Sequence, residues 1–168
     1  MQNAKDTFYE VLRNRIIAIN QERTTVVRGI TRPAILVEEN ELPTEFHLPA
    51  CFRLRWQQAT TDAQGCMPLL TMPCVIEYET AGAAGNGGMD RGRLLSAMDG
   101  ELLAALNQWP QYTQKNNYTP LPNGKPATPM ATNIWWGEPA FAAIEVKQDR
   151  LARTVTVAVM SYQEAGEL

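Results

Sequence analysis

The sequence predicts an α+β fold, a largely antiparallel β-sheet with two main helices packed on one face. Two observations lead to this class. Apolar residues recur at helical spacing in one segment near the N-terminus and in one at 89–109. Most of the other apolar segments alternate with polar residues or are rich in β-branched residues, as strands are. Because the order is helix, strands, helix, strands, both helices can cover the same face of one sheet.

Length and composition predict a single domain. The 168 residues are 45% hydrophobic, enough to bury a core, so we expect one domain over residues 1–168. A net charge of −3 argues against the strongly basic field that is typical of nucleic-acid binders. No apolar run approaches the roughly 20 residues of a membrane helix, and the N-terminus lacks the apolar core of a secretory signal. We therefore expect a cytoplasmic chain without a membrane partner.

The first predicted helix begins at a capping-box pattern, because Thr7 is followed three residues later by Glu10. Asp6 is the competing cap. An amphipathic helix of this kind needs an apolar surface to pack against. Its apolar face comprises Phe8, Val11, Leu12, Ile16 and Ile19.

Strand signals follow the first helix. Residues 24–30 are β-branched, and the segment 32–40 begins near Pro33, where a missing N–H costs least. Residues 51–58 alternate apolar and polar side chains with period two, and residues 73–80 do the same. These two segments predict a long antiparallel hairpin.

The predicted hairpin carries opposite charges on its outer face. Arg53 and Arg55 lie in its first strand, and Glu77 and Glu79 lie in its second. Cross-strand Arg–Glu pairs on a solvated face stabilise by roughly a few tenths of a kcal/mol each. The two glutamates are also spaced to hold a divalent cation, which keeps a metal-dependent enzyme open as an alternative.

A glycine-rich segment at 81–88 precedes the second predicted helix, at 89–109. The segment lacks a following GK[ST], so it is not a phosphate-binding loop of the P-loop type. Asp90 is the candidate N-cap of the helix. Gly100 weakens the middle of the helix by roughly 1 kcal/mol, and Pro110 ends it.

The polar segment 111–132 has no apolar period and predicts a long loop. We expect this segment and the loop 81–89 to be mobile in the free subunit, because few apolar anchors offset the entropy of ordering them. Two strand signals close the chain, a broken one at 131–148 and a long one at 151–162. One face of the last strand comprises Val155, Val157 and Val159.

The sequence contains no catalytic constellation. It lacks GxSxG, HExxH and dinucleotide fingerprints, and the single histidine, His47, leaves no base–nucleophile pair. The cysteines Cys51, Cys66 and Cys74 match no zinc spacing, and their odd number does not indicate a disulfide framework. We therefore expect no enzyme, no cofactor, and no catalytic, cofactor-binding or metal-binding residues.

Adjacent tryptophans mark a candidate interface. Trp135 and Trp136 lie in a strand-like run, so their side chains point to opposite faces. One is expected to join Trp56 in the core, and the other to lie on the outer face. There it contacts a partner, as interface tryptophans often do, or is covered by the same subunit. The interface candidates are Trp135, Trp136, Arg53, Arg55, Gly85, Gly87 and Gly88.

The layout resembles the tail-terminator and minor-tail protein family of long-tailed bacteriophages and prophages. The strings that carry the resemblance are TFYEVLRNRI, RPAILVEEN, CFRLRW with CVIEYET, RGRLLSAMDGELLAAL and ARTVTVAV. The resemblance implies a six-membered ring that caps the tail tube, stops its polymerisation and joins the tail to the head. The family has no catalytic residues, so the resemblance assigns none to this sequence. The glycine loop and the segment 111–132 depart from the family pattern.

The resemblance also implies partners and a location. The partners are further copies of the chain, in a hexameric ring, the tail tube protein, and a head-completion or connector protein. The location is the virion, assembled in the cytoplasm of the bacterial host. DNA would pass through the ring without specific binding, which a non-basic lumen favours. The alternatives are a head–tail joining or tail completion protein and a non-viral binding module.

Overall fold

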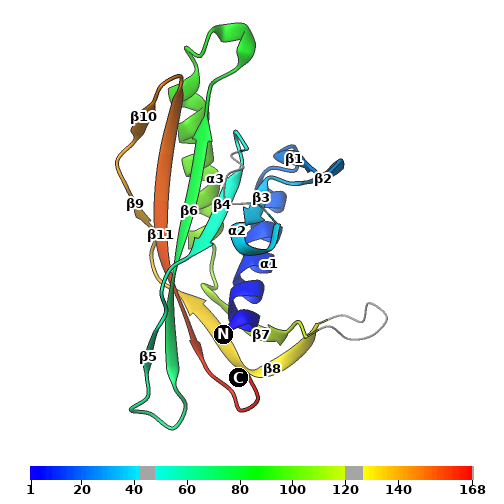
Figure 1. The fold of residues 1–168 in the computed structure, drawn as a ribbon, viewed down its shortest axis with the longest axis vertical. Coiled ribbons are helices and arrows are strands. Elements are labelled where there is room, and N and C mark those ends of the chain that lie inside the picture. The colour runs from blue at the N-terminus through cyan, green and yellow to red at the C-terminus, as the bar shows by residue number, and fades with distance from the viewer. Residues whose placement is uncertain (42–47, 120–126, 168) are drawn as a thin grey trace.

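The computed structural model describes residues 1–41, 48–119 and 127–167. They form an α+β fold in which a curled, largely antiparallel sheet carries two long helices on one face, which confirms the predicted fold class (Figure 1). His47 and the middle of the polar segment 111–132 lie outside the described residues. No described helix is long and apolar enough to cross a membrane.

The sheet is built around two long strands, β6 (Leu69–Thr80) and β11 (Arg150–Tyr162). They pair antiparallel over twelve consecutive residue pairs. Alternating and β-branched residues in both segments favour this extended pairing. The two strands run along the long axis of the molecule, so the other strands of the main sheet take their positions from them (Figure 1).

Further strands extend the sheet on both sides of this pair. On one side β4 (Phe52–Trp56) pairs antiparallel with β6, and β3 (Ile35–Val37) pairs parallel with β4. On the other side β8 (Thr128–Trp136) pairs antiparallel with β11, and β7 (Tyr112–Asn117) pairs antiparallel with β8. The order across the sheet is β3-β4-β6-β11-β8-β7.

Short elements complete the described chain. Two of them form a separate hairpin, and three others pair with the long strands. The hairpin consists of β1 (Thr24–Val27) and β2 (Ile30–Pro33), β5 (Thr60–Asp62) pairs with β6, and β9 (Ala140–Phe141) and β10 (Glu145–Lys147) pair with β11. A single turn of α-helix, α2 (Glu38–Glu41), follows β3, and a 3₁₀ turn, η1 (Ala84–Asn86), lies in the glycine-rich loop.

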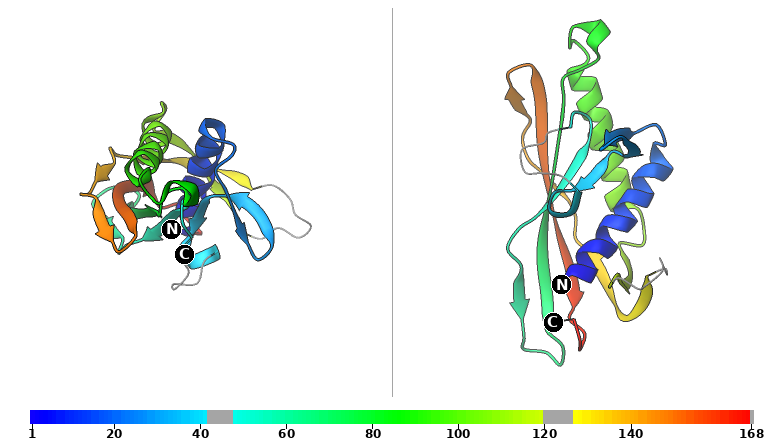
Figure 2. Two further views of the ribbon diagram at one scale, coloured as in Figure 1. Left: turned by 90° about the horizontal axis from the view of Figure 1, so that it is seen from above. Right: turned by 45° about the vertical axis from the view of Figure 1, so that its right-hand side comes forward.

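The two long helices, α1 (Gln2–Ile19) and α3 (Arg91–Asn107), lie side by side on one face of the sheet (Figure 2). Their apolar residues and every second residue of the long strands form one buried cluster. Val155, Val157 and Val159 belong to it, as the alternation predicts. Its other members include Phe8, Leu12, Ile16, Leu95, Met98, Leu102, Leu106, Met72, Cys74 and Ile76.

Arg15 joins α1 to the end of α3. Its guanidinium donates hydrogen bonds to the carbonyl oxygens of Ala105 (3.0 Å), Gln108 (2.8 Å) and Pro110 (2.6 Å). These carbonyls lie at the C-terminus of the helix, where backbone acceptors lack helical partners and a positive charge is favoured. The same guanidinium lies 4.9 Å from the centre of the Trp136 ring.

The cap predicted at Thr7 is wrong, whereas Asp90 is the N-cap residue of α3 as predicted, although its side chain makes no capping hydrogen bond. α1 begins at Gln2, so Thr7 is a buried residue inside the helix rather than its cap. The Thr7 hydroxyl donates to the carbonyl of Asn3 (2.7 Å) and accepts from the amide of Asn116 in β7 (3.0 Å). Asp90 does precede α3, but its carboxylate accepts from the amide of Ala83 (3.0 Å) and holds the glycine-rich loop instead.

The prediction of a loop over 111–132 is wrong for its described ends, because β7 and the first half of β8 occupy them. The polar residues of β7 bond to three different elements, Gln114 to Met130 of β8, Asn116 to Thr7 of α1 and Lys115 to the C-terminal segment, so the strand forms without an apolar period. Lys115 is fully buried, and its ammonium donates to the carbonyl of Tyr162 (2.6 Å) and to the carboxylate of Glu167 (2.7 Å). The mobility of 81–89 stays a prediction.

Replacing the buried lysine tests this attachment. We expect Lys115→Met to lower the free energy of unfolding by about 3 kcal/mol or more, because it removes the nearer of two cations that contact the buried Glu167 carboxylate and leaves only the N-terminal ammonium, at 3.9 Å. Lys147→Met is the matched control: Lys147 pairs with Glu145 at 3.4 Å, with both side chains 58% exposed, and its loss should change stability by about 0.5 kcal/mol at most. Urea denaturation measures both variants, and equal small losses would contradict the assigned role of Lys115.

The C-terminal segment also makes stability depend on pH. Burial raises the pKa of Glu164, but hydrogen bonds from the Thr132 hydroxyl (2.6 Å), the Thr132 amide (2.7 Å) and the Ala131 amide outweigh burial and lower the pKa below its ordinary value of 4.5. A group with a lowered folded-state pKa stabilises above its unfolded pKa, and that stabilisation is lost as pH falls through the folded pKa.

We therefore expect the wild type to be more stable than Glu164→Gln at pH 7, and the difference to shrink below the ordinary pKa of 4.5 and to disappear as the pH falls through the lowered folded-state pKa. Urea denaturation at a series of pH values measures this difference. A difference that stays constant down to pH 2.5 would contradict the assignment.

Candidate functional site

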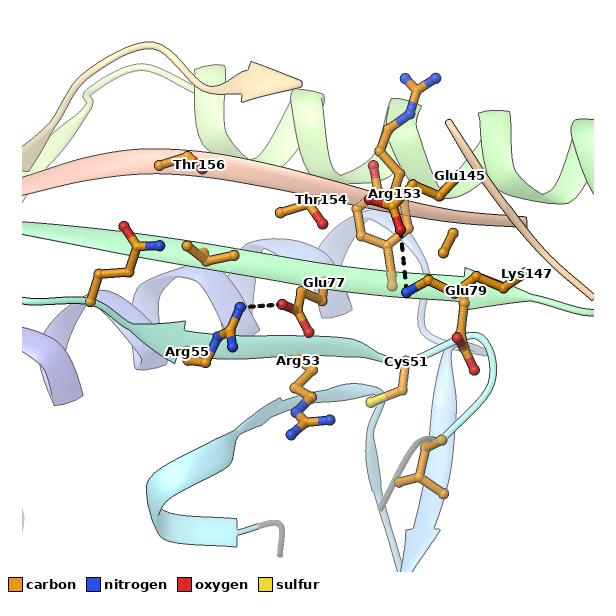
Figure 3. Close-up of a pocket in the computed structure, with 15 residues that line it drawn as sticks. Cys51, Arg53, Arg55, Glu77, Glu79, Glu145, Lys147, Arg153, Thr154 and Thr156 are labelled. Carbon is orange, nitrogen blue, oxygen red and sulfur yellow. Dashed lines mark hydrogen bonds and ion pairs between the residues drawn. The ribbon is translucent and has the colours of Figure 1, made fainter. Parts of the chain in front are cut away.

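The face of the sheet opposite the helices carries the charged residues predicted for the hairpin (Figure 3). It forms a shallow polar hollow of about 370 Å³ over β4, β6, β10 and β11. Arg53 and Arg55 lie on β4, and Glu77 and Glu79 on β6. We call these four residues, together with Thr154 and Thr156 of β11, the polar sheet face.

Arginines and glutamates do pair on this face, as predicted, but Arg53 and Glu77 have different partners from those that the strand register would suggest. Arg53 lies directly opposite Glu77 in the strand register. Its guanidinium, however, contacts the carboxylate of Glu38 at 2.8 Å, and Glu77 accepts from Arg55 at 2.5 Å. The Arg55 and Glu77 side chains are 50% and 32% exposed, so this pair stabilises the fold by less than about 1 kcal/mol.

Glu77 and Glu79 lie on one face, but each of them contacts an arginine. Glu79 pairs with Arg150, and Glu77 pairs with Arg55. Within residues 1–41, 48–119 and 127–167, no group of three or more His, Cys, Asp or Glu side chains is placed to hold a metal ion. The absence of a catalytic metal stays a prediction.

The cysteines differ in environment. Cys51 and Cys74 are buried, and Cys66 is exposed. Burial raises the pKa of the Cys51 thiol to about 12, with a smaller contribution from Glu41, and burial also raises the pKa of Cys74. Both thiols are therefore protonated at neutral pH, which makes them poor nucleophiles.

The adjacent tryptophans point to opposite faces of β8, as the alternation predicts. Trp136 is 4% exposed and lies in the core, where its ring packs edge-on against Phe8 (5.5 Å between centroids) and its Nε1 donates to the carbonyl of Leu106 (2.9 Å). Phe8 also packs against the half-buried Trp56 (5.8 Å), so one phenylalanine contacts both indoles. Trp135 points away from the helices, beside Tyr162 (5.5 Å).

Four aromatic side chains gather where β7, β8 and β11 meet; we call Trp109, Tyr112, Trp135 and Tyr162 the aromatic patch. Trp109 is 78% exposed, Tyr112 50% and Tyr162 40%. Tyr112 lies opposite Trp135 in the register, and the Trp109 ring meets Tyr112 edge-on (6.4 Å). A shallow, open depression of about 440 Å³ lies at the patch, bordered by Tyr112, Trp135 and Tyr162, with Thr132 and Asn133 at its side.

Sequence reasoning found one residue of this patch and missed three. Trp135 was identified from the adjacent tryptophans. Trp109 was predicted only as the end of a helix, and Tyr112 as part of a loop. The sequence does contain one signal for them: Trp109 and Tyr112 are two large aromatic residues in a segment that is otherwise polar, and such residues often mark an exposed binding surface.

The glycine candidates lie elsewhere. Gly85 is in η1, and Gly87 and Gly88 follow it with positive φ (56° and 78°) at the far end of the long strands (Figure 1). A Cβ at Gly88 would collide with the guanidinium of Arg91, whose Nε donates to the carbonyl of Ala81 (3.0 Å). The candidate residues thus occupy four separate places: the glycine loop, the polar sheet face, the aromatic patch and, for Trp136, the core.

No protein-family model matches the chain, and no curated protein sequence matches it either. The functional argument therefore depends on the surfaces described above. Of these surfaces, the aromatic patch most favours binding to another protein, because exposed aromatic residues in a contiguous group are typical of protein–protein contacts.

Alanine substitutions separate the two tryptophans. We expect Trp136→Ala to lower the free energy of unfolding by about 3–5 kcal/mol, because it removes a buried indole and its contact with Phe8. Trp135→Ala should lower it by about 1 kcal/mol at most, because no helix covers that face. Urea denaturation of the isolated subunit measures both. If both changes unfold the subunit equally, Trp135 is a core residue and the interface assignment is wrong.

Proposed function

We propose that this chain is a structural virion protein whose copies form a ring that caps a phage tail tube, ends its polymerisation and joins the tail to the head. The observation that carries the proposal is the aromatic patch, in which three exposed aromatic side chains gather around the half-buried Trp135. Trp and Tyr are enriched among residues that dominate binding energy, so such a group favours a protein partner over a small substrate.

A contact between two different surfaces of the subunit would support ring formation. The patch, the polar sheet face and the glycine loop are built from different elements, so a contact between any two of them would be heterologous. Heterologous contacts repeat from copy to copy and close into a ring when the rotation between neighbours allows it. A specific contact should bury about 800 Å² on each partner. The copy number of six and the tail tube and head-connector partners come from the family resemblance.

The charge distribution supports a ring through which DNA passes without specific binding. On the polar sheet face, Arg53 contacts Glu38 and Arg55 contacts Glu77, so these arginines are neutralised by carboxylates. The whole chain has a net charge of −3. A wall of this kind attracts phosphates weakly, because affinity for DNA grows with the number of phosphates that cations neutralise. The proposed location is the virion, with assembly in the cytoplasm of the bacterial host.

Deleting the chain from the phage or prophage that encodes it tests this function. We expect electron micrographs of the lysate to show headless tail tubes of irregular and excessive length, because nothing ends polymerisation. Complementation with the wild-type chain should restore joined particles. Complementation with Lys147→Met is the control and should also restore joined particles, because Lys147 lies outside the aromatic patch and its ion pair with Glu145 is exposed.

Other outcomes would contradict the proposal. Tail tubes of normal length beside unattached full heads would assign the chain to head–tail joining or tail completion. Normal virions without the chain would identify it as a non-viral or accessory binding module.

A further inference from the structure

The hairpin of β1 and β2 is a two-stranded sheet separate from the main sheet, and we call its residues 24–33 the arm (Figure 2). Two side chains attach the arm to the subunit. Val27 belongs to a small second core, and the guanidinium of Arg32 contacts the carboxylate of Glu41 at 2.8 Å. Because a hairpin alone is only marginally stable, these attachments fix the arm in place.

The tip of the arm exposes apolar side chains on both of its faces. Ile30 lies opposite the buried Val27 in the register, and Val26, the neighbour of Val27, points to the other face. Ile30 is 65% exposed and Val26 is 59% exposed. Neighbouring apolar side chains left at a surface are typical of a contact with another molecule.

Arg28 occupies the turn at the tip of the arm. The φ angles of Arg28 (51°) and Gly29 (78°) are both positive, as in the type I′ turn of two-residue hairpins. Asparagine suits the first position of this turn better than arginine does, so the turn itself does not account for Arg28. Over the three ranges that the structure describes, its guanidinium has no ion pair, hydrogen bond or ring contact.

The aromatic patch offers contacts for all three side chains of the tip. Three rings border its depression, and the side chain of Trp109, 78% exposed and edge-on to Tyr112, adds a second apolar wall. The faces of aromatic rings also attract a guanidinium, because they carry the negative side of the ring quadrupole. The carboxylate of Glu164 lies beside the depression and accepts from the Thr132 hydroxyl (2.6 Å).

The aromatic patch suits Arg28 better than the polar sheet face does. On the polar sheet face, Glu77 and Glu79 each pair with an arginine already. The described residues that line the depression of the patch include no cation that would repel a guanidinium. Contacts of this kind also recur inside the subunit, where arginine lies over an aromatic ring in the pairs Arg13–Tyr9, Arg15–Trp136 and Arg23–Phe52.

The arm and the aromatic patch belong to different sides of the subunit. Figures 1 and 2 show β1 and β2 on one side of the molecule and β11, which carries Tyr162 of the patch, on the other. The exposed fractions of Ile30 and Trp109 show that the arm does not cover the patch within one subunit. A contact between the two surfaces therefore joins two copies, and it is heterologous.

We propose that the arm of one copy packs against the aromatic patch of the next copy, with Val26 and Ile30 on the rings and Arg28 over a ring face. Each subunit then gives its arm to one neighbour and receives an arm from the other. Such a contact closes into a ring where the rotation between neighbours allows it. This inference rests on the proposed ring and names the surfaces that form it.

Two sets of substitutions in the full chain test the contact. The arm variant carries Val26→Thr, Arg28→Asn and Ile30→Thr, which keep β-branched residues in the strands and place asparagine in the turn. The patch variant carries Trp109→Ala and Tyr112→Thr, which remove two exposed rings. Both variants should unfold in urea within about 1 kcal/mol of the wild type, because all five positions are exposed.

Sedimentation velocity measures association, at concentrations up to about 1 mM, where a contact with a micromolar Kd is saturated. We expect each variant alone to stay monomeric. An equimolar mixture should give a one-to-one heterodimer, because the arm variant keeps an intact patch and the patch variant keeps an intact arm. Assembly of either variant alone would overturn the proposal.

The mixture also separates this contact from the proposed ring. A heterodimer supports the contact even if the wild type forms open chains instead of closed rings. Closed rings of the wild type beside a mixture without heterodimer leave the ring standing and overturn this contact. A monomeric mixture overturns the contact whatever the wild type does.

Single substitutions added to the patch variant give the expected sizes. Ile30→Thr should weaken the heterodimer about tenfold, and Arg28→Asn about threefold, because a cation over an exposed ring contributes less than a buried apolar side chain. Val146→Thr is the matched control, because Val146 is 77% exposed but lies on β10, and it should leave the affinity unchanged. Equal affinities for all three would overturn the assignment of the tip.

Discussion

The pairing of β6 with β11 is the constraint on which the rest of the main sheet depends. Twelve consecutive residue pairs make this ribbon long, and the core cluster covers only one of its faces. β4 attaches to one edge and β8 to the other, so the register of these two strands decides which side chains face the helices. The opposite face carries the polar sheet face near the middle and the aromatic patch where β7 and β8 join it.

Two side chains of α1 link the helices to this sheet. Phe8 lies between Trp56 of β4 and Trp136 of β8, so it connects the two sides of the sheet through edge-on ring contacts. Arg15 covers the outer side of Trp136 and satisfies three carbonyl oxygens at and beyond the end of α3. With Trp136 held on this side, the alternation of β8 turns Trp135 outward. The exposed aromatic patch is thus a geometric consequence of how the core is packed.

Alternation made much of the sheet predictable from sequence. The period-two pattern identified β4, β6 and β11 and the faces of their residues, and it separated Trp135 from Trp136. It failed for β7, because that strand is stabilised by polar contacts such as those of Lys115 with the C-terminal segment. The cap prediction failed at Thr7, whose side chain lies inside α1 and accepts from β7, whereas it placed Asp90 correctly at the start of α3, although the Asp90 side chain holds the glycine-rich loop instead of capping the helix. The aromatic patch could not be assembled from sequence, since the β7–β8–β11 register brings its members together.

The central claim is that copies of this subunit associate through different surfaces into a closed ring. Light scattering over a rising series of concentrations, with and without tail tube protein, measures this most directly. The account predicts a mass that reaches a plateau at a closed ring, six times the 18.7 kDa of the subunit if the family resemblance holds. A strict dimer at high concentration, unchanged by tail tube protein, would contradict it, because two copies joined by a two-fold axis use the same surface twice.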